Sequence, residues 1–241
     1  MNNNHIPVML DEVKSFIPTN KKINLIDATF GGGGYSKSIL AEFEVKNLIA
    51  IDRDPISKIF FEELSKDFKN IEFFNEKFSK IDEIISESKY LKEKFDVIIF
   101  DLGVSSNQID IAKRGFSFQK EGPLDMDMGS SNINAFEVIN SFQEKKLADI
   151  FFELGEERFS RRIAKNIVIS RTKKSIKSTL ELSEIIKKSL PFSNTNKKTH
   201  PATKTFQALR IYVNDELNEL KKALEKSESL LAKNGLLIIV S

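Results

Sequence analysis

The sequence predicts a doubly wound α/β fold that is interrupted by a helical insert. In the first half of the chain, short apolar runs alternate with longer amphipathic segments, as in successive βα units of a parallel sheet. After Asp101 helix signals dominate and no strand-like run occurs until a last apolar run near the C-terminus. We therefore expect both ends of the chain to form one sheet domain around an inserted all-helical domain.

Periodicity places the elements of the sheet domain. Apolar, often β-branched runs predict buried strands at 23–28, 48–51, 71–74, 95–100 and 236–240. Helical spacing of apolar residues predicts helices within 36–43, 55–66 and 81–92. A single long helix is expected from Phe206 to Gly235, since one apolar stripe runs through Leu209, Val213, Leu217, Leu220 and Leu224. The chain stops one residue after its last buried strand, so we expect that a C-terminal part of the sheet is missing.

Local signals also predict helix ends within the insert. Ser141 and Ser178 each precede a glutamate by three residues, an arrangement in which both side chains satisfy amides of a first helical turn. Two helices are therefore expected to start there. Gly155 and Pro191 are expected stops, and Pro201 suits the first residue of a further helix.

Positive charge is concentrated in the insert, which we place at 109–208 between sheet segments 1–108 and 209–241. Residues 109–204 hold 18 Lys and Arg against 12 Asp and Glu, whereas the whole chain has a net charge of only +2. This excess fits a surface that faces a polyanion. It fits a solvated, lysine-rich surface equally well.

Composition excludes several kinds of chemistry. The chain has no cysteine, which rules out disulfides, thiolate metal sites and cysteine nucleophiles, and its two histidines leave little scope for a metal site. The N-terminus lacks the apolar core of a signal peptide, and no stretch approaches the ~18 apolar residues of a membrane span. We expect a cytoplasmic protein without a bound metal.

A run of glycines follows the first predicted strand. Gly31 to Gly34 allow a tight turn and a close approach of the backbone to a nucleotide-type cofactor. The Gly-Lys-Ser/Thr signature of a phosphate-binding loop is absent, and Ser36 stands where the third glycine of the dinucleotide fingerprint belongs. A pyrophosphate ligand is therefore disfavoured. S-adenosylmethionine has no phosphate and suits such a loop.

Polar residues follow several predicted strands at the edge where open α/β sheets bind ligands. Asp52 is placed to accept hydrogen bonds from both ribose hydroxyls, a role that nicotinamide and adenosylmethionine enzymes share. Asp27 suits the ammonium of a methionine moiety, or simply orders the glycine loop. Phe78 is placed to lie on an adenine, although most phenylalanines belong to the core. Asp101, with the following residues 102–108, offers a carboxylate, hydroxyls and an amide to a polar planar group, or forms an Asx-type turn into the insert.

Motifs along almost the whole chain carry a specific resemblance. In order they are HIPVMLDE (5–12), DATFG (27–31), AIDRD (50–54), DLGVSS (101–106), RGFSF (114–118), GPLDM (122–126), GEERF (155–159) and HPAT (200–203). Together they resemble the MraW/RsmH family of ribosomal RNA methyltransferases. The resemblance implies a Rossmann-like S-adenosylmethionine-dependent sheet, a helical substrate-recognition insert, and methylation of the exocyclic N4 of a cytidine in the decoding region of 16S RNA of the small ribosomal subunit.

The resemblance also implies site residues. The cofactor contacts of the family fall on Gly33, Gly34, Tyr35, Asp52, Phe78, Asp101 and Gln108. The sequence departs from the family at Tyr35, usually histidine, at Asn107, usually proline, and at Asp127, usually arginine or lysine. A Phe-His-Ser-Leu-Glu-Asp-Arg stretch expected after Ser241 is missing.

Catalysis is expected from Asp101 and Ser105, which would accept the N–H hydrogen bonds of the cytosine amino group. Aromatic and basic residues of the insert could stack on unpaired bases and hold phosphates, or form a solvated helix face: Arg114, Phe116, Phe118, Arg158, Arg161, Arg162 and Lys165. A nicotinamide oxidoreductase would share the glycine loop and Asp52. A non-catalytic RNA-binding protein would need only the basic insert.

Overall fold

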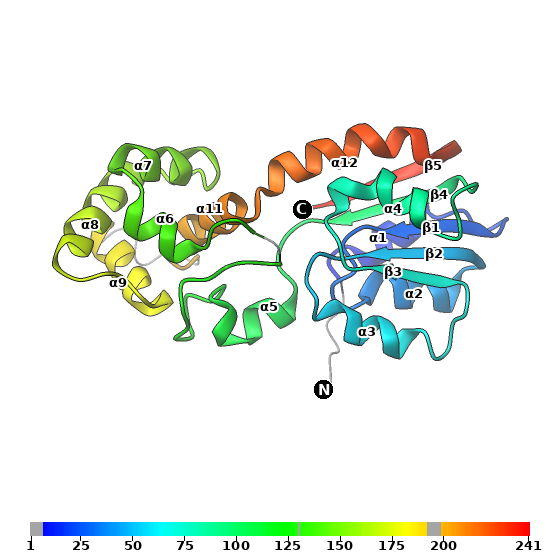
Figure 1. The fold of residues 1–241 in the computed structure, drawn as a ribbon, viewed down its shortest axis with the longest axis horizontal. Coiled ribbons are helices and arrows are strands. Elements are labelled where there is room, and N and C mark those ends of the chain that lie inside the picture. Colours follow the sequence, from blue (N-terminus) through cyan, green and yellow to red (C-terminus); the bar gives the residue numbers. More distant parts are fainter. Residues whose placement is uncertain (1–6, 130, 192–198) are drawn as a thin grey trace. The chain divides into compact units, whose positions relative to one another are not determined.

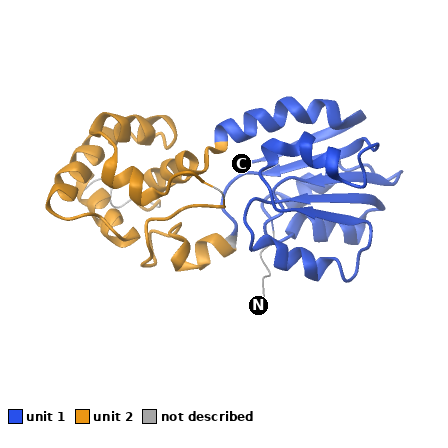
Figure 2. Ribbon diagram, viewed as in Figure 1, with its two compact units in different colours: residues 1–105, 217–241 blue, residues 106–216 orange. Residues whose placement is uncertain are grey.

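The chain folds into two compact units (Figure 2). Our computed structural model describes residues 7–129, 131–191 and 199–241; His5 and Ile6 of the first motif lie outside these ranges. Unit 1 comprises Met1–Ser105 and Leu217–Ser241, and unit 2 comprises Ser106–Glu216. The second boundary therefore follows residue 216, and not residue 208 as we placed it from the sequence.

Unit 1 is built on a parallel five-stranded sheet in the order β3-β2-β1-β4-β5 (Figure 1). The strands confirm the predicted runs: β1 Ile23–Asp27, β2 Val45–Ile51, β3 Ile71–Phe74, β4 Phe95–Asp101 and β5 Leu231–Val240. The chain moves outward from β1 through β2 to β3 and then returns to place β4 on the other side of β1. The order of the strands thus reverses between β1 and β4, the position at which open sheets bind ligands.

Helices cover both faces of this sheet, as the near-continuous apolar strands predict. Leu25 and Val97 point to the face packed by α1 Leu10–Phe16, α2 Gly34–Glu42 and α3 Ser57–Leu64. Their neighbours Ile26 and Ile98 point to the opposite face, packed by α4 Ile81–Glu87 and α12 Glu216–Leu230. A short 3-10 turn, η1 Phe78–Lys80, leads into α4. The predicted doubly wound fold is confirmed.

Unit 2 is helical. Its elements are α5 Ser106–Asp110, η2 Ala112–Arg114, α6 Ala135–Ser141, α7 Glu144–Glu153, α8 Ser160–Lys173, α9 Thr179–Ser189 and α11 Thr203–Asn214. Helix α8 packs against α7 and α9, and α11 packs against α6 and α7. Within its described residues, an isolated bridge between Pro123 and Ser178 is the sole β-type pairing. None of the helices in the described parts of the chain is long and apolar enough to cross a membrane.

The single long helix predicted from Phe206 to Gly235 is wrong, because the structure divides it into α11 and α12. Asp215, between the two helices, has a left-handed backbone with φ of 52°. Leu209 is buried on α11 in unit 2, whereas Leu220 packs on the sheet of unit 1 and Leu217, between them, is 57% exposed. One apolar stripe therefore serves two cores.

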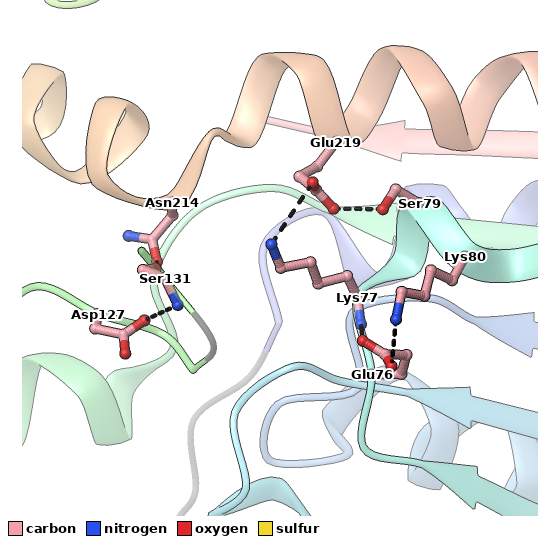
Figure 3. A network of polar contacts seen from close by, with 8 residues as sticks. All are labelled: Glu76, Lys77, Ser79, Lys80, Asp127, Ser131, Asn214 and Glu219. Atoms are coloured by element: carbon pink, nitrogen blue, oxygen red, sulfur yellow. Dashed lines mark hydrogen bonds and ion pairs between the residues drawn. The ribbon is translucent and has the colours of Figure 1, made fainter. Parts of the chain in front are cut away.

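Asn214, the last residue of α11, holds a neighbouring loop of unit 2 (Figure 3). Its buried amide donates to the Met126 carbonyl at 2.7 Å and accepts from the Met128 N–H at 2.9 Å. Asp127, which departs from the family pattern, caps the same loop by accepting from the Gly129 N–H at 2.8 Å. These bonds favour ending the helix at this residue.

Strand β5 begins directly after α12, so Gly235 lies in the strand and does not end the helix. The register shifts between Phe95, opposite Leu231, and Val97, opposite Leu236. A Cβ on Gly235 would lie 2.9 Å from the Phe95 carbonyl oxygen, so only glycine fits this irregularity.

One of the two predicted capping boxes is confirmed. The Ser178 hydroxyl accepts from the Glu181 N–H at 3.2 Å, and the Glu181 carboxylate accepts from the Ser178 N–H at 3.2 Å. Ser141 caps nothing, because it ends α6 and its hydroxyl donates to the Glu137 carbonyl at 2.5 Å. The box at α6 instead joins Asn134 to Glu137. Asparagine serves as an N-cap residue as well as serine does, but the prediction considered only serine.

Candidate active site

The carboxyl edge of the sheet in unit 1 gathers the acidic residues singled out from the sequence. Asp27 ends β1, Asp52 follows β2, and Asp101 ends β4. Because these strands are parallel neighbours, their carboxyl ends meet at the same edge, beside the point where the strand order reverses.

The glycine loop lies across this edge, where the Phe30 N–H donates to the Ile51 carbonyl at 3.0 Å. Gly31 and Gly33 have φ of 53° and 76°, which disfavours any other residue at either position. A Cβ on Gly33 would lie 2.7 Å from the Phe30 ring, so this glycine makes room for the protein's own aromatic side chain. At Gly34 helix α2 begins, and the N–H groups of a first helical turn have no partner within their helix.

Asp52 is fixed by the loops on either side of it. Its carboxylate accepts from the Gly31 N–H at 2.5 Å and from the Asp54 N–H at 2.8 Å, and also bonds to the Ser57 side chain. Its carbonyl accepts from the Asn75 amide at 2.8 Å. Burial raises the pKa of Asp52 to about 6 against the opposing effect of these hydrogen bonds. A carboxylate has about four lone-pair positions, so capacity for a hydroxyl donor remains.

Asp27 is buried behind the loop. Its carboxylate accepts from the Ser36 hydroxyl at 2.6 Å and from the Thr29 N–H at 3.3 Å. Burial raises the pKa of Asp27 to about 6, and the charges of Asp52 and Asp101 raise it further. Ser36, the residue that breaks the dinucleotide fingerprint, thus holds an acid at the edge of the sheet.

The two predicted catalytic residues lie at this same edge. The Asp101 N–H donates to the Thr29 hydroxyl at 2.6 Å, which joins the end of β4 to the start of the glycine loop. The Cβ of Ser105 lies 3.7 Å from the position that a Cβ on Gly31 would take. Both residues therefore lie next to the glycine loop. Thr29 accepts the hydrogen bond that holds Asp101 there, a role that the sequence left open.

The remaining predicted cofactor contacts differ in their surroundings. Phe78 is half-buried at the start of η1 and meets Phe100 edge to face, with 5.6 Å between ring centroids. The Tyr35 side chain is buried in the core and donates to the Val8 carbonyl, and burial raises the pKa of Tyr35 to about 12. This leaves the backbone of Tyr35 for a ligand. Gln108 is buried on α5 and belongs to unit 2, unlike the other predicted contacts.

Helix α12 anchors the turn that carries Phe78 (Figure 3). Buried Glu219 accepts from the Ser79 hydroxyl and lies 3.8 Å from the Lys77 ammonium, and Lys226 donates to the Ser79 carbonyl at 2.8 Å. Sequence reasoning missed this network because its partners lie far apart along the chain. No sequence pattern indicated Glu219, because helical spacing places it outside the predicted stripe of Leu217, Leu220 and Leu224.

The hydrogen-bond acceptors at this edge fit a cationic ligand that carries ribose hydroxyls. Partly desolvated carboxylates at one edge gain from a nearby positive charge, and Asp52 retains capacity for hydroxyl donors. The backbone of the glycine loop permits a close approach. Across the described ranges, no group of three His, Cys, Asp or Glu side chains is arranged to hold a metal ion.

Comparisons with known proteins identify the family of the chain. The model of the MraW methylase family matches residues 2–241. The ribosomal RNA small subunit methyltransferase H of Wolbachia sp. subsp. Drosophila simulans (strain wRi) is 45% identical over 239 residues, which cover 98% of this chain and 80% of the relative. The same-named protein of Orientia tsutsugamushi (strain Boryong) is 44% identical over 247 residues, covering 100% of this chain and 77% of the relative. The chain belongs to the MraW methylase family.

Proposed function

We propose that this protein transfers a methyl group from S-adenosylmethionine to the exocyclic N4 of a cytidine in the decoding region of 16S ribosomal RNA. S-adenosylmethionine as the methyl donor follows from membership of the methylase family. The observation that carries the RNA substrate is 45% identity over 98% of the chain to a relative named as a small-subunit ribosomal RNA methyltransferase. The same membership leaves no support for a nicotinamide oxidoreductase.

The residues at the carboxyl edge suit the parts of this cofactor. Asp52 would accept hydrogen bonds from the ribose hydroxyls. Asp27 would face the ammonium of the methionine moiety, and Phe78 would lie on the adenine. The loop from Gly31 to Gly34 would let the backbone approach the ligand. When bound, the cofactor supplies an electrophilic methyl group on a sulfonium.

Asp101 and Ser105 would orient the nucleophile. The amino nitrogen of cytosine is a weak nucleophile, because its lone pair is delocalised into the ring. A carboxylate and a hydroxyl that accept its N–H hydrogen bonds would hold the nitrogen in line with the methyl group. Orientation alone can supply about 7–11 kcal/mol, so a strong base is not required. The base must reach this edge, which favours an unpaired or flipped nucleotide.

The test is transfer of labelled methyl groups to small ribosomal subunits and to deproteinised 16S RNA, with the product nucleoside identified by mass spectrometry. We expect N4-methylcytidine at one position, and far slower formation of it with Asp101→Ala. A different methylated nucleoside would refute the proposed substrate atom. No transfer to either substrate, despite measured cofactor binding, would refute the proposed RNA substrate.

A further inference from the structure

Helix α8 has an unusual charge composition. Its sequence from Ser160 to Lys173 contains no aspartate or glutamate, and Arg158 lies just before it. Helices α7 and α9, which pack against it, each mix acidic and basic residues. The excess positive charge of the insert therefore has a definite location on this helix.

The basic residues of α8 lie on the side opposite its packed face. The packed face comprises Ser160, Ile163, Ala164 and Ile167, all buried. Arg171 belongs with this packed side, because its guanidinium donates to the Ile139 carbonyl at 2.5 Å and thereby ties α8 to α6. At 3.6 residues per turn, the remaining basic side chains project from the other side. These exposed residues are Arg161, Arg162, Lys165 and Lys173; together with exposed Arg158, two residues before the helix begins, we name them the α8 basic face.

Carboxylates do not neutralise this face. Throughout the described part of the chain, no Asp or Glu oxygen lies within 4.0 Å of its nitrogens. Some other lysines of unit 2 do pair: Lys120 lies 3.3 Å from Asp110, Lys174 lies 3.5 Å from Glu181, and Lys187 lies 3.9 Å from Glu184. Like charges on one helix face repel one another, and a bound polyanion would relieve that repulsion.

We propose that the α8 basic face binds the phosphate backbone of the substrate RNA, an inference that rests on the proposed function for the identity of that RNA. Arginine presents a planar fork of donors that matches a phosphate, and successive phosphates suit a row of cations along a helix. Ile169, 46% exposed on the same side, offers an apolar contact for a ribose or a base. A second copy of this chain is a poor occupant, because it would bring two such faces of like charge together.

The test compares two variants that each lose three positive charges. R161A/R162A/K165A removes the centre of the face, and K58A/K66A/K92A removes exposed lysines of unit 1 as a control. Binding to deproteinised, unmodified 16S RNA is measured without cofactor over a series of salt concentrations, after equal melting temperatures have been verified. We expect the α8 variant to bind roughly tenfold more weakly or worse, and its salt slope to fall by about 2, because each phosphate contact to a single strand contributes about 0.7. The control should stay within about twofold of the wild type.

Equal salt slopes for the two variants would overturn the inference. A loss of binding to assembled subunits but not to naked RNA would also overturn it, in favour of an acidic protein as the partner. These binding measurements do not depend on catalysis. If the wild type fails to methylate, the proposed function is contradicted while the slopes still decide the role of α8; if methylation is intact and the slopes are equal, only the α8 inference is rejected.

Discussion

Charge is used in two different ways at the carboxyl edge of unit 1 and on the α8 basic face of unit 2. At the edge, Asp27 and Asp52 are held by backbone and hydroxyl donors, and burial raises the pKa of each to about 6. On α8, residues such as Arg161 and Lys165 are exposed, and solvent screens them. One substitution at the edge should therefore have a large effect, whereas the face should act through the sum of its charges.

The largest effect should come from Asp101. We expect Asp101→Ala to lower kcat by roughly 10²–10⁴-fold, because the variant loses the acceptor that orients the amino group. The bond to Thr29 is retained, since it uses the Asp101 backbone N–H, and thermal unfolding of the variant is measured alongside. Methyl transfer at saturating cofactor and RNA measures this. Asp67→Ala, an exposed aspartate of the same unit, is the matched control; equal activity of the two variants would remove Asp101 from the mechanism.

Asp52→Ala should raise the dissociation constant of the cofactor by roughly 10–100-fold, since a charged hydrogen-bond acceptor contributes about 1.5–3 kcal/mol. The variant also releases the N–H groups of Gly31 and Asp54, which loosens the loop. Isothermal titration calorimetry measures the affinity for the cofactor. Affinity for RNA should be unchanged, which would support separate roles for the carboxyl edge and the α8 basic face. Cofactor affinity within twofold of the wild type would show that the ribose lies elsewhere.

The affinity for the cofactor should depend on pH, because two carboxyls at the edge, Asp27 and Asp52, have raised pKa values. Because the pKa of Asp27 and of Asp52 is raised to about 6, both carboxyls take up protons as the pH falls through 6, and affinity should weaken by up to about tenfold per pH unit for each proton involved. For the unfolding free energy the sign is opposite. A folded pKa above the unfolded value of 3.8 stabilises the ligand-free fold at low pH, and this contribution is lost as the pH rises through 6.

Calorimetry between pH 5 and 8 measures the affinity, and H5Q/H200Q, which lacks both histidines of the chain, is the control. An affinity that does not change over this range, or a dependence that disappears in the control, would assign the titration to other groups.

The smallest effect should come from Glu219, a buried acid that would touch no substrate. Glu219→Ala removes the acceptor of the Ser79 hydroxyl, so the turn carrying Phe78 should move and raise the KM for the cofactor by roughly threefold to tenfold with kcat unchanged. Glu219→Gln keeps an acceptor oxygen and should restore KM. A fall in kcat, or no rescue by glutamine, would contradict this positioning role.

The sequence predicted the sheet and the acidic residues at its carboxyl edge because both depend on short-range patterns. A buried parallel strand such as Phe95–Asp101 is a continuous apolar run, and the residue that ends it lies at the carboxyl edge of the sheet. The sequence could not predict contacts between distant segments. The break at Asp215 follows from two cores sharing one apolar stripe, and the bond from Ser79 to Glu219 joins residues with no local relation.

The sequence also could not predict the directions in which side chains point. Tyr35 lies in the first turn of α2, directly after the glycine loop, yet its hydroxyl donates to the Val8 carbonyl, and no spacing rule indicates that partner. Likewise, Ser141 and Ser178 show the same S-x-x-E pattern, and only packing decides that one ends a helix and the other starts one.

One experiment can separate cofactor binding at the carboxyl edge from RNA binding on the α8 basic face. Steady-state methyl transfer with Asp52→Ala and with R161A/R162A/K165A would give separate KM values for S-adenosylmethionine and for RNA. Our account predicts that Asp52→Ala raises the KM for the cofactor alone, and that the triple variant raises the KM for RNA alone. A rise in both constants for either variant, or the opposite assignment, would contradict it.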